Sequence, residues 1–279
     1  MNISQNTNRS AGIRVERVAP AVGAEIHGVD LAAPLDDATV GAIRQALVAH
    51  GVVFFRDQRL DSRQYEAFAA RFGEPTLPNS GIIPKLEGAR VIAEVRKEEG
   101  RERNVGGSWH TDQVYRPHPS WGTMLLCRQL PATGGDTLFA SMSAAFEKLS
   151  PGLQKTLEGL RAVHSNAAVQ ARMKTGREAE PDVTHPVVIR HPESGRKILY
   201  VSPSYTQRFE GWTEAESRPL LEYLFQHGQH PEFALRFRWQ PGSLAFWDNY
   251  QTWHFAVNDY AAGERVMHRI VVEGPPFQR

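Results

Sequence analysis

The chain has 279 residues, of which 41% are hydrophobic and 23% are charged, and its formal net charge is +1. This is enough apolar material for one large domain or two small ones. Lysine and arginine are scattered and form no basic block, so we expect no nucleic-acid partner, and no acidic tail suggests an adaptor. The single cysteine, Cys127, excludes an internal disulfide and favours a reducing, cytoplasmic setting. No stretch approaches about 18 uninterrupted apolar residues, so we expect no membrane span.

The N-terminal segment, residues 1–12, is polar and lacks the apolar core of a signal peptide, so we expect it to be disordered. Residues 13–279 are expected to form a single domain. Within it, residues 74–108 are largely irregular, because proline, glycine and charged residues interrupt the regular spacings. We interpret this segment as lid-like, with one strand predicted at 89–95.

Two helices and a strand are predicted near the N-terminus. Apolar residues at helical spacing indicate a helix that Asp36 or Asp37 caps and that Gly51 ends. The residues that follow, 52–56, are continuously apolar up to an arginine and indicate a buried strand. A second amphipathic helix is predicted over 61–73.

The rest of the chain is rich in predicted strands. Short apolar or alternating runs are separated by turns that contain glycine or proline, which is typical of a barrel or a double-sheet jelly roll. We therefore predict a mainly β fold with helices packed outside it. The predicted strands cover 122–130, 136–141, 186–190, 197–202, 234–239, 243–249, 252–257 and 265–272, and helical patterns lie around 142–160 and 213–227.

The motif "WHTDQVY" places His110 and Asp112 two residues apart. On a strand, such residues point to the same face. An imidazole and a carboxylate that project together suit iron(II). In such sites two histidines and one carboxylate bind one side of the metal and leave the other positions open. The spacing alone is a weak signal, because two other pairs share it within His-Pro-Glu motifs that favour turns. These pairs are His191 with Glu193 and His230 with Glu232.

The C-terminal third adds a further histidine and two arginines. His254 lies on one predicted strand, and Arg265 and Arg269 lie four residues apart on one face of a later strand. A buried guanidinium needs an anionic partner, and its planar fork suits a carboxylate. The alternative is that one arginine is solvated, or pairs with Glu264 or Asp259.

Together these residues resemble the iron(II)/2-oxoglutarate dioxygenases of the taurine and dichlorophenoxyacetate (TauD/TfdA) family. The resemblance begins with His110-Thr111-Asp112, the distal His254, and an arginine eleven residues beyond it. It runs from about residue 15 to about residue 274. Its most specific stretches are "WHTD", "LPATGGDTLFASM", "HPVVIRHPESGRKILYV", "FRWQPGSLAFWDN" and "DYAAGERVMHR".

The resemblance implies a double-stranded β-helix, in agreement with the strand pattern. It also implies the cofactors iron(II), 2-oxoglutarate and O2, with His110, Asp112 and His254 as the metal ligands and catalytic centre. The partner implied is a small anionic substrate. We expect a homo-oligomer, a dimer or a tetramer, whose order the sequence does not fix.

Two further roles follow from the same resemblance. Arg265 and Thr137 match the residues that hold the distal carboxylate of 2-oxoglutarate, and a threonine hydroxyl can donate to such a group. Arg269 matches the residue that meets the anionic group of the substrate.

Departures from taurine dioxygenase bear on the substrate. That enzyme carries a histidine and a tyrosine after the "FGE" turn and an asparagine before "WHTD", all of which are missing here. Other patterns resemble the phenoxypropionate-type enzymes, so an aryloxyalkanoate that undergoes ether cleavage is the expected substrate. The alternatives are a sulfonate or alkyl sulfate, or a biosynthetic hydroxylation or desaturation. Ile82, Ile83 and Tyr205 are expected to line the substrate pocket, although the isoleucines could equally be ordinary apolar packing.

Two other classes of protein remain open on the residues alone. A non-catalytic binding barrel would not need the three ligands and both arginines together. A zinc hydrolase could use two histidines and a carboxylate, but it would need a general base near the metal and no arginine for 2-oxoglutarate.

Overall fold

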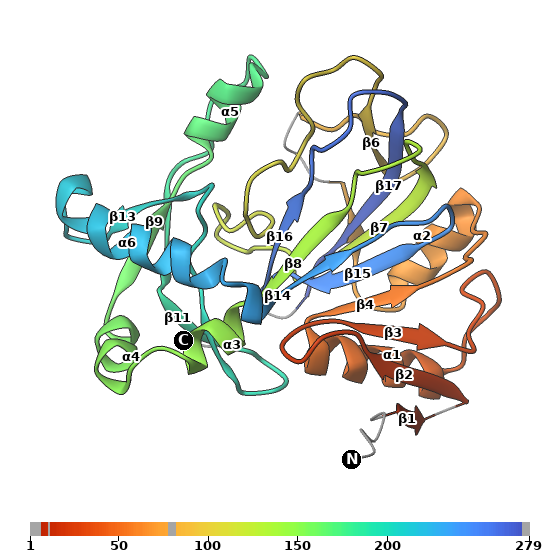
Figure 1. Cartoon of the computed structure of the whole chain (residues 1–279), viewed down its shortest axis with the longest axis horizontal. Helices are drawn as coiled ribbons and strands as arrows, with labels where there is room; N and C mark the ends of the chain where they lie inside the picture. The colour runs from red at the N-terminus through yellow and green to blue at the C-terminus, as the bar shows by residue number, and fades with distance from the viewer. Residues whose placement is uncertain (1–6, 11, 78–81, 275–279) are drawn as a thin grey trace.

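The fold is built around one large sheet. The computed structural model describes residues 7–10, 12–77 and 82–274. The sheet has nine strands, eight of them in the order β1-β2-β3-β4-β15-β7-β17-β5, with β6 paired to β17 (Figure 1). The strands in that order are β1 (Thr7–Ser10), β2 (Ile13–Arg17), β3 (Ala24–His27), β4 (Val52–Phe55), β15 (Leu244–Asp248), β7 (Gly122–Gln129), β17 (Arg265–Val272) and β5 (Pro75–Thr76), followed by β6 (Ala93–Lys97).

A second sheet packs against the first and closes the barrel. It has three strands in the order β14-β8-β16, which are Ala234–Phe237, Thr137–Ser141 and Thr252–Ala256. Apolar side chains from both sheets meet between them, and the rings of Phe54 and Phe237 stack at 3.9 Å. Two sheets with a shared apolar interior form a jelly roll. The predicted mainly β fold, a double-stranded β-helix with flanking helices, is confirmed.

Alternation along the strands separates the barrel interior from the outer face of the large sheet. On β4, Phe54 belongs to the interior cluster, whereas Val53 and Phe55 pack on the other side. On β17, Met267 faces the interior and Ile270 faces outward. This period of two residues is the one expected of a pleated strand. It confirms the predicted division of β17 into two faces.

Two helices cover the outer face of the large sheet. α1 (Asp37–His50) begins where the Asp36 side chain accepts a hydrogen bond from the Thr39 N–H, at 2.7 Å, and ends at Gly51, whose φ is 75°. Asp36 is therefore the cap, and not Asp37. α2 (Ser62–Ala70) begins with a capping box. Both predicted helices are confirmed, and their apolar faces pack against the sheet residues that point away from the barrel interior, such as Val53, Phe55 and Ile270.

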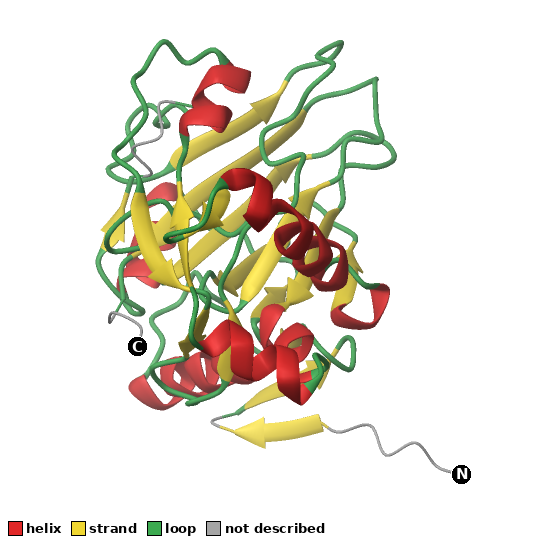
Figure 2. Ribbon diagram, turned by 90° about the vertical axis from the view of Figure 1, so that its left-hand side faces the viewer, coloured by secondary structure: helices red, strands yellow, loops and turns green. Residues whose placement is uncertain are grey.

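A long insertion between β8 and β14 builds a second layer beside the barrel (Figure 1). One of its helices, α5, lies at the opposite end of the molecule from α1 and α4 in both ribbon views (Figure 2). The insertion contains α3 (Met142–Glu147), α4 (Pro151–Glu158), β9 (Arg161–His164), α5 (Ala167–Met173), β10 (Val183–Pro186), β11 (Val188–Arg190), β12 (Lys197–Leu199), β13 (Thr206–Phe209), α6 (Glu214–Gly228) and the 3-10 turn η1 (Pro231–Phe233).

The insertion differs from the prediction in two respects. The helical pattern over 142–160 is two helices, because Ser150 caps the second one and Pro151 at its first position has no N–H to continue the first. The short elements α5, β9, β10 and β13 were not predicted. Outside the insertion, the strand predicted at 89–95 is observed as β6 at Ala93–Lys97, shifted toward the C-terminus.

The N-terminal segment is only partly described. Residues 7–10 form β1, which pairs with β2, so the prediction of disorder is wrong for them. Residues 1–6 and 11 lie outside the described residues. In the lid-like segment 74–108, the described residues contain β5 and β6, and 78–81 lie outside them. The lid and the single domain remain predictions.

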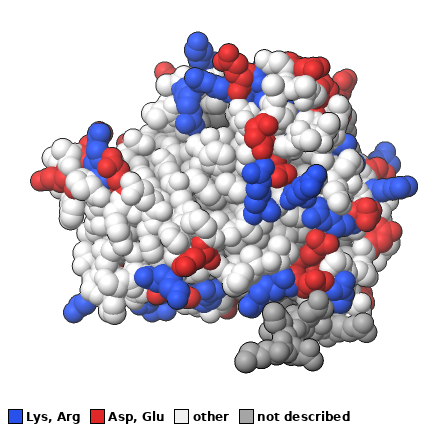
Figure 3. Space-filling view, viewed as in Figure 1, with Lys and Arg blue, Asp and Glu red and all other residues white. Residues whose placement is uncertain are grey.

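The surface shown in Figure 3 carries basic and acidic side chains side by side, with a broad uncharged area beside them. On this face no continuous basic patch is visible, as the scattered charges of the sequence predict. Among the described residues, no helix combines the length and the apolar character that crossing a membrane requires.

Candidate metal centre and cosubstrate site

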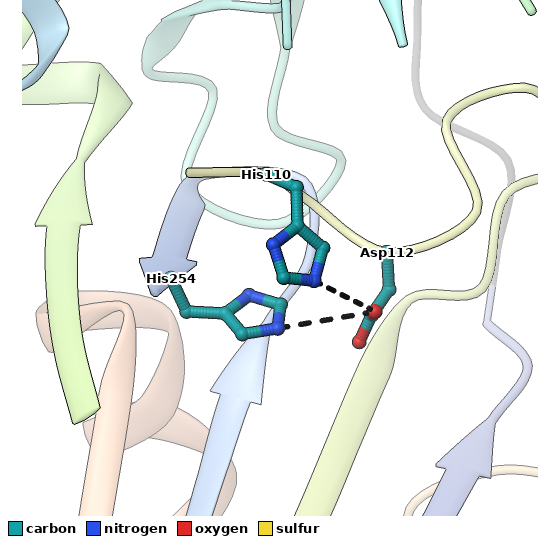
Figure 4. Close-up of side chains that lie close together, drawn as sticks. All are labelled: His110, Asp112 and His254. Atoms are coloured by element: carbon teal, nitrogen blue, oxygen red, sulfur yellow. Dashed lines mark ion pairs between the residues drawn. The ribbon is translucent and has the colours of Figure 1, made fainter. Parts of the chain in front are cut away.

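A cluster of two histidines and an aspartate links the two sheets of the barrel (Figure 4). His254 comes from β16, whereas His110 and Asp112 come from the segment that leads into β7. The Nε2 atoms of His110 and His254 lie 3.8 and 3.9 Å from Asp112 Oδ1. In the described part of the chain, this is the one group of three or more such side chains close enough to share a metal ion.

His110 meets His254 through a single β-bridge and not through a strand. The backbone N–H of each residue donates to the carbonyl of the other, at 3.1 and 2.8 Å. The chain then turns, and Gln113 has a φ of 57°, a left-handed conformation that an extended strand does not contain. The prediction that His110 and Asp112 share one face of a strand is therefore wrong, although the turn brings the same two side chains together.

Both imidazoles are in the form that binds metal. His110 Nδ1 lies 2.7 Å from the carbonyl oxygen of Ser108, which can only accept a hydrogen bond. Nδ1 therefore carries the proton, and Nε2 keeps its lone pair for a ligand. Burial lowers the pKa of His110, and burial together with the neighbouring His110 lowers the pKa of His254 well below its ordinary value. Both rings are neutral at neutral pH.

The carboxylate of Asp112 is buried, and neighbouring groups compensate its negative charge. Burial alone would raise its pKa, yet the charge of Arg269 and a hydrogen bond from Thr123 contribute to a pKa well below the ordinary range. Arg269 Nη2 lies 2.7 Å from Asp112 Oδ2. The buried charge of Arg269 is thus paired with Asp112, and not with Glu264 or Asp259 as one alternative had it.

Arg265 lies deeper in the barrel and has a spare hydrogen-bond donor. Its Nε donates to the carbonyl of Gly135 at 2.9 Å, whereas its buried Nη2 has no hydrogen-bond partner among the described residues. Burial lowers the pKa of this guanidinium. The ring of Trp239 lies 5.9 Å from the Arg265 guanidinium carbon, and its Nε1 donates to Thr137 Oγ1 at 2.9 Å, so the Thr137 hydroxyl keeps its own proton to donate. A carboxylate beside Arg265 and Thr137 would satisfy both groups.

A cavity opens beside the cluster. The predicted pocket residues Ile82, Ile83, Tyr205 and Arg269 all line it, as do His110 and Asp112. Burial raises the pKa of Tyr205, so its phenol is un-ionised, and its ring contacts that of Tyr115 at 4.9 Å. Part of the cavity lining is therefore apolar, and charged side chains line the part next to the three candidate ligands.

Sequence reasoning missed one wall of this cavity. Helix α5 contributes Val169, Gln170, Arg172 and Met173 to the lining. It has seven residues and no side-chain cap at its start. Seven residues make only about two helical turns, which is too short for an apolar period to be visible in the sequence.

The two His-Pro-Glu motifs do not hold metal ligands. His191 Nδ1 accepts hydrogen bonds from the N–H groups of Glu193 and the next residue, as expected of a turn, while its Nε2 lies 2.6 Å from the buried Asp248 Oδ2. His230 Nδ1 lies 3.9 Å from Glu232 Oε2, and both side chains are exposed. The interpretation of both motifs as turn chemistry is supported.

The donor set of the cluster fits iron(II). Two neutral imidazole nitrogens and one carboxylate oxygen on one side of a metal, with the other positions open, are the arrangement that non-heme iron oxygenases use. The spare donors of Arg265 and Thr137 fit the distal carboxylate of a dicarboxylic cosubstrate.

A family model described as "Taurine catabolism dioxygenase TauD, TfdA family" matches residues 14–271. The chain belongs to this family. An alpha-ketoglutarate-dependent sulfate ester dioxygenase of Pseudomonas putida is 36% identical and covers 93% of this chain and 89% of its own. An alkylsulfatase of Acinetobacter baylyi is 34% identical, with coverages of 96% and 87%. The solved structure of a taurine dioxygenase from Burkholderia xenovorans is 38% identical, with a TM-score of 0.82 and coverages of 95% and 92%.

Membership of the TauD/TfdA family identifies the protein as an iron(II)- and 2-oxoglutarate-dependent dioxygenase, an oxidoreductase that also uses O2. It is therefore neither a zinc hydrolase nor a binding barrel. The finer prediction, a place near the phenoxypropionate enzymes, is not confirmed, because the relatives described above are named for sulfate esters and taurine.

The first prediction concerns metal binding. We expect Asp112→Ala to abolish turnover and to weaken iron(II) binding by more than about 100-fold, because loss of a ligand should exceed the roughly 10–100-fold effect of disturbing a supporting group. Calorimetric titration of the metal-free protein would measure this. Glu232→Ala is the control, since that carboxylate is 75% exposed and should leave binding unchanged. Unchanged affinity in Asp112→Ala would refute the assignment.

The second prediction concerns 2-oxoglutarate. In Arg265→Ala, the distal carboxylate of 2-oxoglutarate would be buried without its charged partner, which costs about 2–5 kcal/mol. At about 1.4 kcal/mol per tenfold, the apparent affinity for 2-oxoglutarate should fall by roughly two to three orders of magnitude. Thr137→Val should show the same trend more weakly.

Saturation curves for 2-oxoglutarate would test this second prediction. The matched control is Arg236→Ala, because this arginine pairs with Asp136 and Asp259 on the surface and is 51% exposed. An Arg265→Ala enzyme that saturates like the wild type would contradict the role.

Proposed function

We propose that this dioxygenase oxidises a sulfate ester of an apolar alcohol, with a sulfonate as the alternative substrate class. The observation that carries the proposal is the pair of sulfate ester enzymes at 36% and 34% identity, each of which aligns with more than nine-tenths of this chain. We therefore propose the alternative expected from the sequence, an alkyl sulfate or sulfonate, in place of the aryloxyalkanoate.

The proposed roles of the residues follow from their chemistry. His110, Asp112 and His254 would hold iron(II), and Arg265 with Thr137 would hold the distal carboxylate of 2-oxoglutarate. When bound, iron, 2-oxoglutarate and O2 supply an oxidising centre that hydroxylates the substrate as 2-oxoglutarate becomes succinate and CO2. The protein supplies orientation and a pocket from which water is excluded.

The cavity beside the three candidate ligands suits an anion with an apolar body. Ile82, Ile83, Val169 and Met173 offer apolar contact, and Arg269 offers a bidentate guanidinium next to Asp112. Such a lining favours a monoanion whose charged group faces the arginine and whose carbon chain lies against the aliphatic side chains.

The chemistry of a sulfate ester fits an oxygenase without any hydrolytic group. Hydroxylation of the carbon that bears the ester oxygen gives a hemiacetal-like sulfate. Its carbon–oxygen bond to sulfate breaks as the new hydroxyl loses its proton, which yields an aldehyde and sulfate. The second oxygen atom of O2 enters succinate. No general base positioned for attack by water is needed.

Arg172 on α5 supplies a second positive charge at the cavity. Its Nη2 lies 3.5 Å from Ser108 Oγ, and among the described residues it has no carboxylate within ion-pair distance. Arg269, by contrast, already shares its charge with Asp112. An incoming anion that contacts Arg269 would therefore gain additional attraction from Arg172, whose charge no described carboxylate compensates.

Substrate-dependent formation of succinate tests the substrate class. A medium-chain alkyl sulfate, a phenoxypropionate and taurine would be compared at equal concentrations with the wild-type enzyme. We expect the alkyl sulfate to be turned over at least about tenfold faster than either of the others, with aldehyde and sulfate formed in equal amounts. A faster rate with the phenoxypropionate would replace the proposal by ether cleavage, and a faster rate with taurine by sulfonate oxidation.

The contribution of Arg172 can be measured separately. We expect Arg172→Gln to raise the KM for the anionic substrate about tenfold, which corresponds to about 1.4 kcal/mol, and to leave the KM for 2-oxoglutarate within about twofold. Arg177→Gln removes the same charge just beyond α5, outside the cavity lining, and is the matched control. Equal effects of the two variants would show that only the general positive field matters.

A further inference from the structure

Asn249, directly after β15, ties the segment that carries two candidate ligands to β7. Its backbone carbonyl accepts a hydrogen bond from the hydroxyl of Thr111, the residue between His110 and Asp112. Its side-chain Nδ2 donates to Thr123 Oγ1 at 2.9 Å. All of these residues are buried. A single residue thus contacts both the ligand segment and the first strand after it.

The orientation of the Asn249 amide is fixed by a second contact. Nδ2 also lies 3.3 Å from the carbonyl oxygen of Ser120. A carbonyl can only accept, so the nitrogen and not the oxygen of the amide must face this side. Nδ2 therefore acts as donor to the Thr123 hydroxyl as well.

This donor determines the direction of the next hydrogen bond. The Thr123 hydroxyl has one proton, and its oxygen already accepts from Asn249. The proton must then point to Asp112 Oδ2, which lies 2.8 Å away. The chain of donation runs from the Asn249 amide through Thr123 to the carboxylate.

The result is a carboxylate with one oxygen occupied and one free. Asp112 Oδ2 accepts from Thr123 and from Arg269. Oδ1 faces the Nε2 atoms of His110 and His254. Because Asp112 lies on a turn, no strand pairing holds its side chain in this orientation.

We propose that Asn249 and Thr123 are positioning residues that orient Asp112 to offer only Oδ1 to the metal. This inference rests on the proposed iron ligands. The Thr123 hydroxyl occupies Oδ2 and keeps the carboxylate from turning or binding through both oxygens. The bond from Thr111 to Asn249 holds the backbone of the same turn. Neither Asn249 nor Thr123 belongs to the group of candidate ligands; both act through Asp112.

Metal affinity without turnover tests the inference. Metal-free full-length protein would be titrated with Co(II), and the visible absorption of bound Co(II) would report affinity and geometry. We expect Thr123→Val to weaken Co(II) binding roughly 10–100-fold, the usual effect of losing a group that supports a ligand. Thr123→Ser keeps the hydroxyl and should bind within about threefold of the wild type.

A matched control separates positioning from general stability. Thr252→Val removes a buried hydroxyl that donates to the Gly51 carbonyl at 3.0 Å, outside the ligand network. It should lower the melting temperature about as much as Thr123→Val but leave Co(II) affinity unchanged. A loss of affinity common to both variants would overturn the inference in favour of a structural role.

A second variant covers the case in which Thr123→Val does not fold. In Asn249→Asp the new carboxylate cannot donate, so the Thr123 hydroxyl turns toward it and leaves Asp112. We expect weaker Co(II) binding and an altered Co(II) spectrum, and wild-type values would overturn the inference. Asp112→Ala, measured in parallel, distinguishes failure of the ligand assignment from failure of the positioning role. If it binds Co(II) normally, the ligand assignment fails and the positioning role with it; if it alone loses affinity, only the positioning role fails.

Discussion

The negative charge of Asp112, held inside an apolar barrel, is the constraint on which the rest of the site depends. An isolated buried carboxylate is very costly. Here Arg269 at 2.7 Å and the Thr123 hydroxyl at 2.8 Å compensate it, and the two neighbouring imidazoles stay neutral because burial lowers their pKa. A fixed anion beside two neutral nitrogen donors is a site that attracts a divalent cation. The same contacts that stabilise the fold thus prepare the metal centre.

The strand β17 spaces the two buried arginines. Arg265 and Arg269 share one face, and four residues of extended chain separate them by about 13 Å. Arg269 therefore reaches Asp112 and the cavity, while Arg265 lies further along the barrel beside Gly135. Its buried Nη2 is a hydrogen-bond donor without a partner among the described residues. This spacing supports the proposal that Arg265 binds the cosubstrate and Arg269 the substrate.

The barrel and the insertion contribute differently to the site. Strands and the turn after His110 provide the candidate ligands and Arg265, all held by backbone pairing or buried hydrogen bonds. The cavity wall opposite the barrel comes from α5 in the insertion, with Val169 and Met173 facing the cavity. Connecting segments change more readily than the sheet that supports them. Substrate choice can therefore vary in this family while the metal centre stays the same.

The sequence by itself determined the helices α1 and α2, most strands and the two faces of β17, because these depend on local periodicity. The three candidate ligands were predicted from the family resemblance. Tertiary structure decided the rest. It made the ligand segment a turn, paired Arg269 with Asp112, brought α5 to the cavity, and joined His191 to Asp248 at 2.6 Å. These contacts join residues far apart in the chain, and the register of the strands that fixes their distances leaves no local pattern in the sequence.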